Sequence, residues 1–210
     1  GPTISLAILA QIIALILSVP LGIIAAYKRG TAVDVTAVTA SLLGTAIPGF
    51  LLSMFLMLFF GVYHHWFPVS GYVGLDQGLL EHLRYLFVPA LSLGIVQAAY
   101  ITRMTRSSLL EVLYKNFIRT ARAKGLKEKK VILTYALKNA APAILTAVGQ
   151  SFGSLVTGTI VTETLFNIPG IGMLTMGAIN RRDIFLIQGV VLFVTLVYVL
   201  VNLVVDILYG

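Results

Sequence analysis

The sequence predicts an all-α protein that crosses a membrane several times. Hydrophobic residues make up 58% of its 210 residues and charged residues only 11%, so the chain is much more apolar than an ordinary soluble domain. Five long segments are almost free of charge, and each has the roughly 20 residues that a helix needs to cross about 30 Å of hydrocarbon. Helices also satisfy their own backbone hydrogen bonds, which lipid cannot do.

Each expected span ends at residues typical of a membrane boundary. The first ends before the basic pair Lys28 and Arg29, and the second before an aromatic cluster that begins at Tyr63. The third ends where a run of basic residues begins. The fourth begins near Pro142, which the first turn of a helix tolerates, and the fifth follows a charged turn. The five expected spans are residues 4–26, 36–62, 87–107, 141–162 and 184–208.

The 15 Lys and Arg residues are distributed unevenly between the gaps, which orients the chain. Twelve lie after the first span or between the third and fourth, and three (Arg84, Arg181 and Arg182) lie in the alternate gaps. We therefore expect an outer N-terminus and a cytoplasmic C-terminus. One further span before residue 1 is the simplest explanation of an outer N-terminus and would make six. The expected inner loops are 27–35 and 108–140, and the outer loops are 63–86 and 163–183.

The second inner loop contains the stretch IRTARAKGLKEKK at 118–130, which holds six Lys and Arg residues. Before Gly125, apolar residues recur at every fourth position, which predicts one amphipathic helix that ends at this glycine. A second helical run is expected from Lys127 onward. The recurring apolar residues are Leu109, Leu113, Phe117 and Ala121.

Periodicity leaves more than one interpretation of this loop open. A positively charged loop held at anionic lipid explains both the charge and the amphipathic pattern. A docking surface for a cytoplasmic partner is indicated by the length of the loop, which exceeds what a connector needs. Nucleic-acid binding is disfavoured, because the basic residues lie against the bilayer with few stacking aromatic residues.

Several stretches of the chain resemble one family of membrane proteins. They are RMTRSSLLEVL (103–113), FIRTARAKGL (117–126), ALKNAAPAILT (136–146), TETLFNIPGIG (162–172) and NRRDIFLIQG (180–189). These stretches are similar to the membrane permease of ABC-type dipeptide, oligopeptide and nickel importers. The resemblance covers essentially the whole chain and is to the B-type permease of the pair, from its second transmembrane helix to its sixth. It implies a type I ABC importer permease, in which residues 1–210 are one transmembrane domain with a coupling-helix loop at 108–140.

In this family the loop carries the EAA motif, which is Glu-Ala-Ala, three residues and then Gly. Aligned on Gly125, Arg119 and Thr120 stand in place of Glu and Ala, whereas Ala121 and Gly125 match. The form Arg-Thr-Ala-Arg-Ala-Lys-Gly-Leu is typical of peptide and nickel permeases. The resemblance implies that a coupling helix docks on an ATPase through Arg119, Thr120, Ala121, Arg122, Ala123, Lys124, Gly125 and Leu126.

The resemblance also implies the partners of the chain. A second homologous permease completes the translocation pathway, two cytoplasmic ATP-binding subunits supply energy, and an extracytoplasmic solute-binding protein delivers cargo to the prokaryotic inner membrane. No catalytic residue or cofactor is expected in this chain, because it has no phosphate-binding P-loop, so ATP and Mg²⁺ would bind to the partner subunits. The sequence leaves open whether the cargo is a dipeptide, an oligopeptide or a nickel complex, and whether the two permeases are identical.

Two groups of residues are candidates for the pathway itself. Gly149, Gly153 and Gly158 are expected to allow close helix packing beside the pathway. Charged residues of the outer loop are candidates for contact with the binding protein, with the alternative that they only mark the membrane boundary. These residues are Glu163, Arg181, Arg182 and Asp183.

Other classes of function are less well supported by the sequence. Residues 149–153 match the Gly-x-Ser-x-Gly pattern of hydrolases, with Ser151 as the nucleophile, but no His lies within a span to act as the base of an intramembrane hydrolase. An ion-gradient-driven secondary transporter predicts ionisable residues at mid-membrane, and the central parts of these spans contain essentially none. No metal site is expected at His64, His65 and His82, because no carboxylate pattern completes one.

Overall fold

The computed structural model describes the backbone of residues 1–207 and their side chains except those of Thr157, Val205 and Asp206. Within this part of the chain every regular element is helical. The expected fifth span reached residue 208, which lies outside the described residues. The elements are α1 (Pro2–Tyr27), α2 (Ala32–Ala46), α3 (Gly49–Leu56), η1 (Met57–Tyr63), η2 (Leu75–Gln77), α4 (Leu79–Leu113), α5 (Asn116–Ala123), α6 (Glu128–Lys130), η3 (Val131–Ala136), α7 (Leu137–Gly158), α8 (Ile160–Leu165), α9 (Ile171–Asn180) and α10 (Ile184–Ile207).

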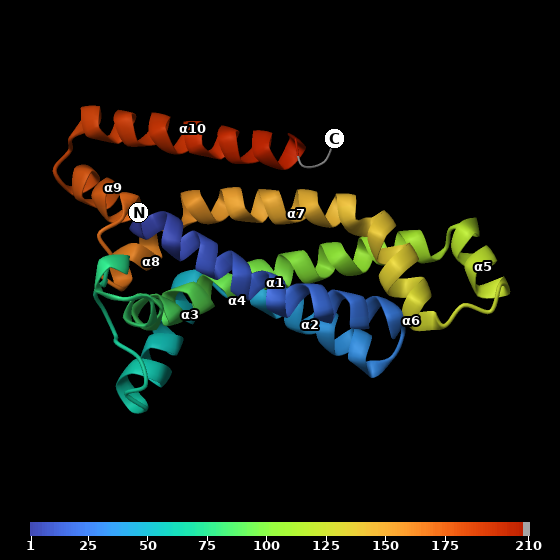
Figure 1. The fold of residues 1–210 in the computed structure, drawn as a ribbon. Coiled ribbons are helices and arrows are strands. Elements are labelled where there is room, and N and C mark those ends of the chain that lie inside the picture. Colours follow the sequence, from blue (N-terminus) through green and yellow to red (C-terminus); the bar gives the residue numbers. More distant parts are fainter. Residues whose placement is uncertain (208–210) are drawn as a thin grey trace.

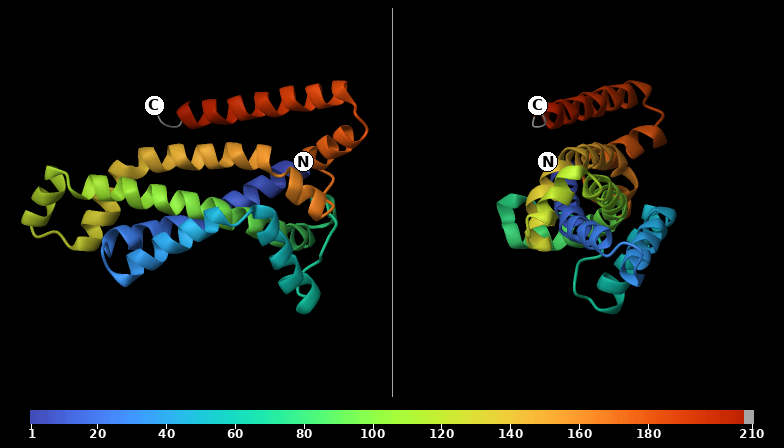
Figure 2. Two further views of the ribbon diagram at one scale, coloured as in Figure 1. Left: turned by 180° about the vertical axis from the view of Figure 1, so that it is seen from behind. Right: turned by 90° about the vertical axis from the view of Figure 1, so that its right-hand side faces the viewer.

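Three long helices, α1, α4 and α7, lie side by side and form the centre of the molecule (Figure 1). The turn between α1 and α2 lies at the same end as α5 and α6, and we call this the inner end because it carries most of the basic residues. At the opposite, outer end lie α8, α9 and the connection from η1 to α4. Helix α10 runs beyond α7, at the edge of the bundle, in both views of Figure 2.

Small side chains allow α1 and α4 to approach closely. A Cβ atom on Gly22 would lie 2.6 Å from Cβ of Thr105, and one on Gly94 would lie 2.9 Å from the carbonyl oxygen of Ala10. Small residues at such spacing are a common means of packing helices in lipid, where hydrophobicity alone does not drive association. The buried small residues on this face of α1 are Ala7, Ala10, Ala14, Ser18, Gly22 and Ala25.

The five predicted spans correspond to four long apolar helices and one bent pair. The span predicted over 36–62 is a bent pair of helices, because α2 and the α3–η1 segment meet at 99°. Pro48 explains the break: a proline disfavours helical backbone at the residue before it, and Ile47 is extended, with φ −75° and ψ 123°. The helix restarts at Gly49, and Ser53 of α3 then donates a 2.8 Å hydrogen bond to Ser92 of α4.

Two helix boundaries also differ from the prediction. Helix α4 begins at Leu79, eight residues before the expected start at 87, so His82 is helical and buried. The predicted amphipathic helix that continues past Leu109 to Gly125 is wrong in one respect, because α4 ends at Leu113 and α5 begins separately at Asn116.

Candidate functional site

The inner end carries a helical hairpin, which we call the coupling hairpin and define as residues 116–130. Helix α5 follows α4 after a break at Lys115, where the backbone is extended, with ψ 151°. It ends at Ala123, the chain turns at Gly125, and α6 then leads back through η3 into α7. The hairpin therefore connects the two central helices α4 and α7 at their inner ends.

The bend of the hairpin is a Schellman motif. Gly125 has a φ of +73°, in the left-handed region that glycine adopts without penalty. Its N–H donates to the carbonyl of Arg122 at 2.9 Å, and the N–H of Leu126 donates to the carbonyl of Ala121 at 3.4 Å. The prediction that Gly125 ends α5 and permits the bend between the two helices is therefore confirmed.

An ion pair braces the bend from outside. The guanidinium of Arg122 donates two hydrogen bonds to the Glu128 carboxylate, at 2.6 and 3.2 Å, and so joins the end of α5 to the start of α6. The carboxylate holds the pKa of Arg122 above its ordinary value. Both side chains are partly exposed, so the pair orients the hairpin more than it stabilises it.

One face of α5 is already buried against its own chain. Ile118 and Ala121 are buried in a cluster with Leu109 of α4 and Val131 of η3. The break at Lys115 shifts the helical phase, so Phe117 lies on the outside rather than on the predicted apolar stripe with Leu109.

Because this face is buried, the eight predicted coupling residues fall into a buried group and an exposed group. Ala121 is buried and Leu126 is half-buried against the same cluster, so neither presents its side chain fully on the hairpin surface. The remaining six are exposed. Phe117, which was not among the predicted coupling residues, adds an exposed apolar side chain beside them. The exposed six are Arg119, Thr120, Arg122, Ala123, Lys124 and Gly125.

A basic cavity of about 510 Å³ lies between the hairpin and the inner end of α1. Arg29 donates a hydrogen bond to the Tyr114 hydroxyl, and its guanidinium carbon lies 5.3 Å from the centre of that ring, a cation–π contact. Arg119 and Arg122 also line the cavity. The α1–α2 turn thus contacts Tyr114, which lies between α4 and the start of the hairpin.

Asp34 of α2 and Arg106 of α4 form a bidentate ion pair, which was not among the predicted interactions. The two hydrogen bonds measure 2.5 and 2.8 Å, and the N–H of Gly30 donates a third to Asp34 at 2.9 Å. Asp34 is only 4% exposed, so its charge depends on these partners. Asp34 is the single acidic residue of the short basic loop at 27–35, which indicates that it has a basic partner. The partner could not be identified from the sequence, because Arg106 is 72 residues away.

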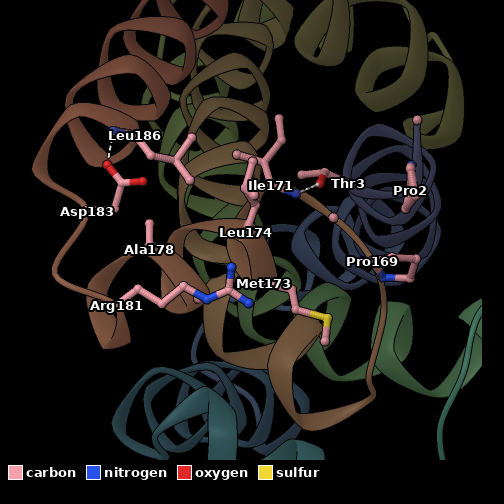
Figure 3. A pocket seen from close by; sticks show the side chains of 13 residues that line it. Pro2, Thr3, Pro169, Ile171, Met173, Leu174, Ala178, Arg181, Asp183 and Leu186 are labelled. Atoms are coloured by element: carbon pink, nitrogen blue, oxygen red, sulfur yellow. Dashed lines mark hydrogen bonds between the residues drawn. The ribbon is translucent and has the colours of Figure 1, made fainter.

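At the outer end, the side chains of Thr3 and Glu163 hold the start of α9, and we call this arrangement the outer clamp. One Glu163 oxygen accepts hydrogen bonds from the N–H groups of Gly172 at 2.7 Å and Met173 at 3.2 Å. The Thr3 hydroxyl of α1 accepts from the N–H of Ile171 at 2.9 Å, as Figure 3 shows. The first three N–H groups of α9, which have no partner inside the helix, are thus all bonded to side chains.

The outer clamp corrects the prediction made for Glu163. Its side chain is fully buried, and its second oxygen accepts a 3.0 Å hydrogen bond from the Thr159 hydroxyl. It therefore cannot contact a binding protein in this conformation. Gly170 and Gly172 make room for it, since a Cβ on Gly170 would collide with the carboxylate and one on Gly172 with the backbone of Ile160.

The other three outer-mouth candidates are exposed. Arg182 has a φ of +57°, because it occupies the left-handed position of the Schellman motif that ends α9. Asp183 follows it and accepts a 3.0 Å hydrogen bond from the N–H of Leu186 at the start of α10. Arg181 extends across an open pocket of about 620 Å³ between α1, α9 and α10 (Figure 3).

The three candidate pathway glycines do not lie on one face. A Cβ on Gly153 would lie 2.5 Å from the ring of Tyr198, so this glycine allows α10 to approach α7. Gly149 lines a groove of about 490 Å³ between α1, α7 and α10. Gly158 is exposed, and a Cβ built on it would meet no atom within 4 Å.

The residues of the alternative functions have structural roles. Ser151 is buried and donates a 2.8 Å hydrogen bond to the side-chain oxygen of Gln11 on α1. His82 bonds to the carbonyl of Val73 at 2.7 Å, and His64 lies beside Trp66. Among the described residues no three His, Cys, Asp or Glu side chains converge as metal ligands would.

Comparison with known proteins defines the class to which this fold and hairpin belong. Residues 18–210 match the sequence model of the binding-protein-dependent transport system inner membrane component. This match covers most of the chain, and the chain therefore belongs to this family of multi-pass inner-membrane transport proteins.

Among individual relatives, peptide permeases are prominent. The chain is 41% identical over 208 residues to a probable peptide ABC transporter permease of Sinorhizobium fredii, and 40% identical over 231 residues to the dipeptide transport system permease of Escherichia coli. Each match covers 99% of this chain, but 66% and 68% of the two relatives. The chain thus spans about two thirds of the length of the curated relatives it matches.

Solved structures confirm the fold. A structure of the inward-facing MetNI methionine ABC transporter matches with a TM-score of 0.79 at 16% identity, over 99% of this chain and 91% of that one. An amino acid ABC transporter with histidines matches with a TM-score of 0.68 at 15% identity, over 99% and 89%. The fold is therefore that of a type I ABC importer permease.

Removing the buried carboxylate tests the outer clamp. We expect Glu163→Ala to destabilise the subunit by about 2–4 kcal/mol, because two N–H groups and a hydroxyl lose their acceptor in a buried site. The stability of Glu163→Gln should lie between that of Glu163→Ala and that of the wild type, since it keeps one acceptor oxygen. The measurement is thermal unfolding in detergent or nanodiscs. Glu81→Ala is the control, because that carboxylate is exposed on α4; equal melting temperatures for all variants would contradict the clamp.

The left-handed backbone at Gly125 predicts a second result. Because nothing lies within 4 Å of a Cβ built there, Gly125→Ala adds no clash, and its cost is the left-handed conformation alone, about 1–2 kcal/mol. We expect the hairpin to repack and ATP-dependent transport to fall. Gly189→Ala on α10 is the control, since that site is equally open and carries no such strain. If both variants transport at the wild-type rate, the bend has no role in coupling.

Proposed function

We propose that this chain is the membrane-spanning permease subunit of an ATP-driven ABC importer and that the coupling hairpin transmits ATPase motion to the spans. The observation that carries the proposal is the hairpin, in a chain of the binding-protein-dependent family. It projects from the inner end, and its own Schellman motif and ion pair brace it. Ile118 anchors it in the core, so a push on α5 would move α4 and α7 as a rigid body.

The exposed face of α5 suits an acidic groove on an ATPase. Phe117 offers an apolar anchor, and Arg119 and Lys124 supply positive charge around it. An aromatic side chain surrounded by charge is a common arrangement at interfaces, in which the aromatic residue contributes affinity and the charges set orientation. Two cytoplasmic ATP-binding subunits, which would hold ATP and Mg²⁺, are the partners for this face.

The remaining partners follow from the arrangement of the two ends. A second homologous permease would complete the pathway, with the C-terminus of this chain on the cytoplasmic side. At the outer end, the open pocket beside Arg181 and Asp183 would face an extracytoplasmic binding protein. No nucleic-acid partner and no enzymatic activity of the chain itself are part of the proposal.

Peptides are the proposed cargo. Relatives at 40–42% identity are named as peptide or dipeptide permeases, and these matches cover nearly all of this chain. Dipeptides and oligopeptides are both compatible with this similarity, as are related small solutes such as nickel complexes. Import rather than export is the proposed direction, because the family depends on binding proteins.

Uptake by the assembled transporter tests this proposal. The full-length subunit, its partner permease and the ATPases would be reconstituted in vesicles with the binding protein, and uptake of a labelled dipeptide would be measured with ATP on the side of the hairpin. We expect uptake that requires ATP and a loss of about tenfold or more for Phe117→Asp, which places a charge at the ATPase contact.

Tyr63→Ser provides the matched control for this experiment, because Tyr63 is an exposed aromatic residue at the outer end. The Tyr63→Ser variant should take up the dipeptide at the wild-type rate, with the same requirement for ATP. Dipeptide uptake without ATP would contradict the importer, and wild-type coupling in Phe117→Asp would contradict the proposed contact.

A further inference from the structure

Along one face of α7, the residues whose side chains the structure describes are exposed and are small or polar. They follow one another at intervals of three or four residues, so they form one stripe on the helix. Gly158 lies at its outer end, where a Cβ would meet no atom within 4 Å. We call this set the α7 stripe, and its members are Asn139, Ala143, Thr146, Gln150, Ser154 and Gly158, all exposed.

The stripe differs from the exposed apolar surfaces of the bundle, which suit contact with lipid. On α10, which lies at the edge of the bundle, the exposed residues are large and apolar: Phe185 is 87% exposed and Leu192 is 72% exposed. The exposed face of α1 is similar, with Ile16 at 66%. Lipid-exposed helix faces are expected to be apolar, so the α7 stripe is unsuited to contact with hydrocarbon.

Two polar pairs from α4 border the stripe near the middle of both helices. The side-chain amide of Gln97 donates a 2.9 Å hydrogen bond to the Ser154 hydroxyl, and the Tyr100 hydroxyl donates a 3.0 Å hydrogen bond to the side-chain oxygen of Gln150. Gln150 and Ser154 are exposed and Gln97 and Tyr100 are half-buried, so the pairs lie at a surface rather than in the core. Polar side chains at this depth normally face a water-filled cavity or another polar surface.

The chemistry of these four residues fits an uncharged, hydrogen-bonding ligand. A glutamine amide has two donor hydrogens and two acceptor lone pairs, and the bond with Tyr100 uses one acceptor position of Gln150. All four side chains are amides or hydroxyl groups, which donate and accept hydrogen bonds without carrying a formal charge. Peptide main-chain amides carry the same donors and acceptors in every peptide, whatever the side chains, so this surface can bind peptides with little dependence on their sequence.

We propose that the α7 stripe, with Gln97 and Tyr100 of α4, lines the translocation pathway and binds the main-chain amides of the passing peptide. This assignment rests on the proposed importer function and names the surface that its cargo contacts. A second permease then faces the stripe across water and peptide rather than packing directly on it.

Thiol labelling tests whether the stripe faces water. The 210 residues contain no cysteine, so a thiol introduced in this region is unique there. In the full-length subunit within its assembly, we expect Ala143→Cys and Thr146→Cys to react with a charged, membrane-impermeant maleimide, and a dipeptide in excess to slow this reaction. Leu192→Cys on the lipid-facing side of α10 is the control and should stay unreactive, because a thiol in hydrocarbon does not ionise.

Dipeptide uptake by the same assembly tests the contact with the peptide. We expect Gln150→Leu to lower uptake about five- to tenfold, because a peptide amide loses its partner. Gln77→Leu is the matched control, since Gln77 is exposed in the outer connection, and it should transport normally.

The outcomes separate this assignment from the proposed function. If the wild type imports dipeptide but the stripe thiols are unreactive, or react without protection by dipeptide, the pathway assignment is wrong and the importer function stands. Crosslinking of the stripe thiols directly to the partner permease in place of labelling would likewise overturn the assignment. If the wild-type assembly does not import dipeptide at all, both proposals fail.

Discussion

The close approach of α1 and α4 is the contact on which the rest of the structure depends. In a membrane, two helices gain little by burying apolar side chains, so they associate where small residues let their backbones come together. Gly22 against Thr105 and Gly94 against Ala10 provide that approach. The other elements are attached to this pair: α7 packs along α4, α2 and α3 lie against it, and α10 packs against α7 and α9.

Polar contacts at the two ends of this pair position the functional segments. At the outer end, Thr3 of α1 and the buried Glu163 hold the start of α9, which orients the surface proposed to meet a binding protein. At the inner end, Asp34 and Arg106 join α2 to α4 just before the coupling hairpin. Because α4 and α7 carry both the hairpin and the α7 stripe, a displacement of the hairpin would reach the proposed pathway through two continuous helices rather than through loops.

The sequence predicts the positions of the apolar helices and the bend at Gly125, because each depends on local composition or on one glycine. It does not predict the 99° bend in the second span, since Pro48 lies in an otherwise uninterrupted apolar run. The sequence also predicts the wrong surroundings for two side chains, since Phe117 is exposed and Glu163 is buried. A two-residue break at Lys115 shifts the helical phase of α5, and the carboxylate of Glu163 is buried by partners on α9 that no local pattern reveals. Pairings across long separations, such as Asp34 with Arg106, require the fold.

Hydrogen–deuterium exchange of the assembled transporter tests the central claim, that the coupling hairpin is the contact through which an ATPase drives this permease. The amides of α5 would be compared in the permease pair with and without the ATPase subunits. We expect added protection confined to residues 116–126, on the exposed face around Phe117, with α9 at the outer end unchanged as the internal reference. Unchanged exchange in α5 together with protection elsewhere on the inner end would contradict the account.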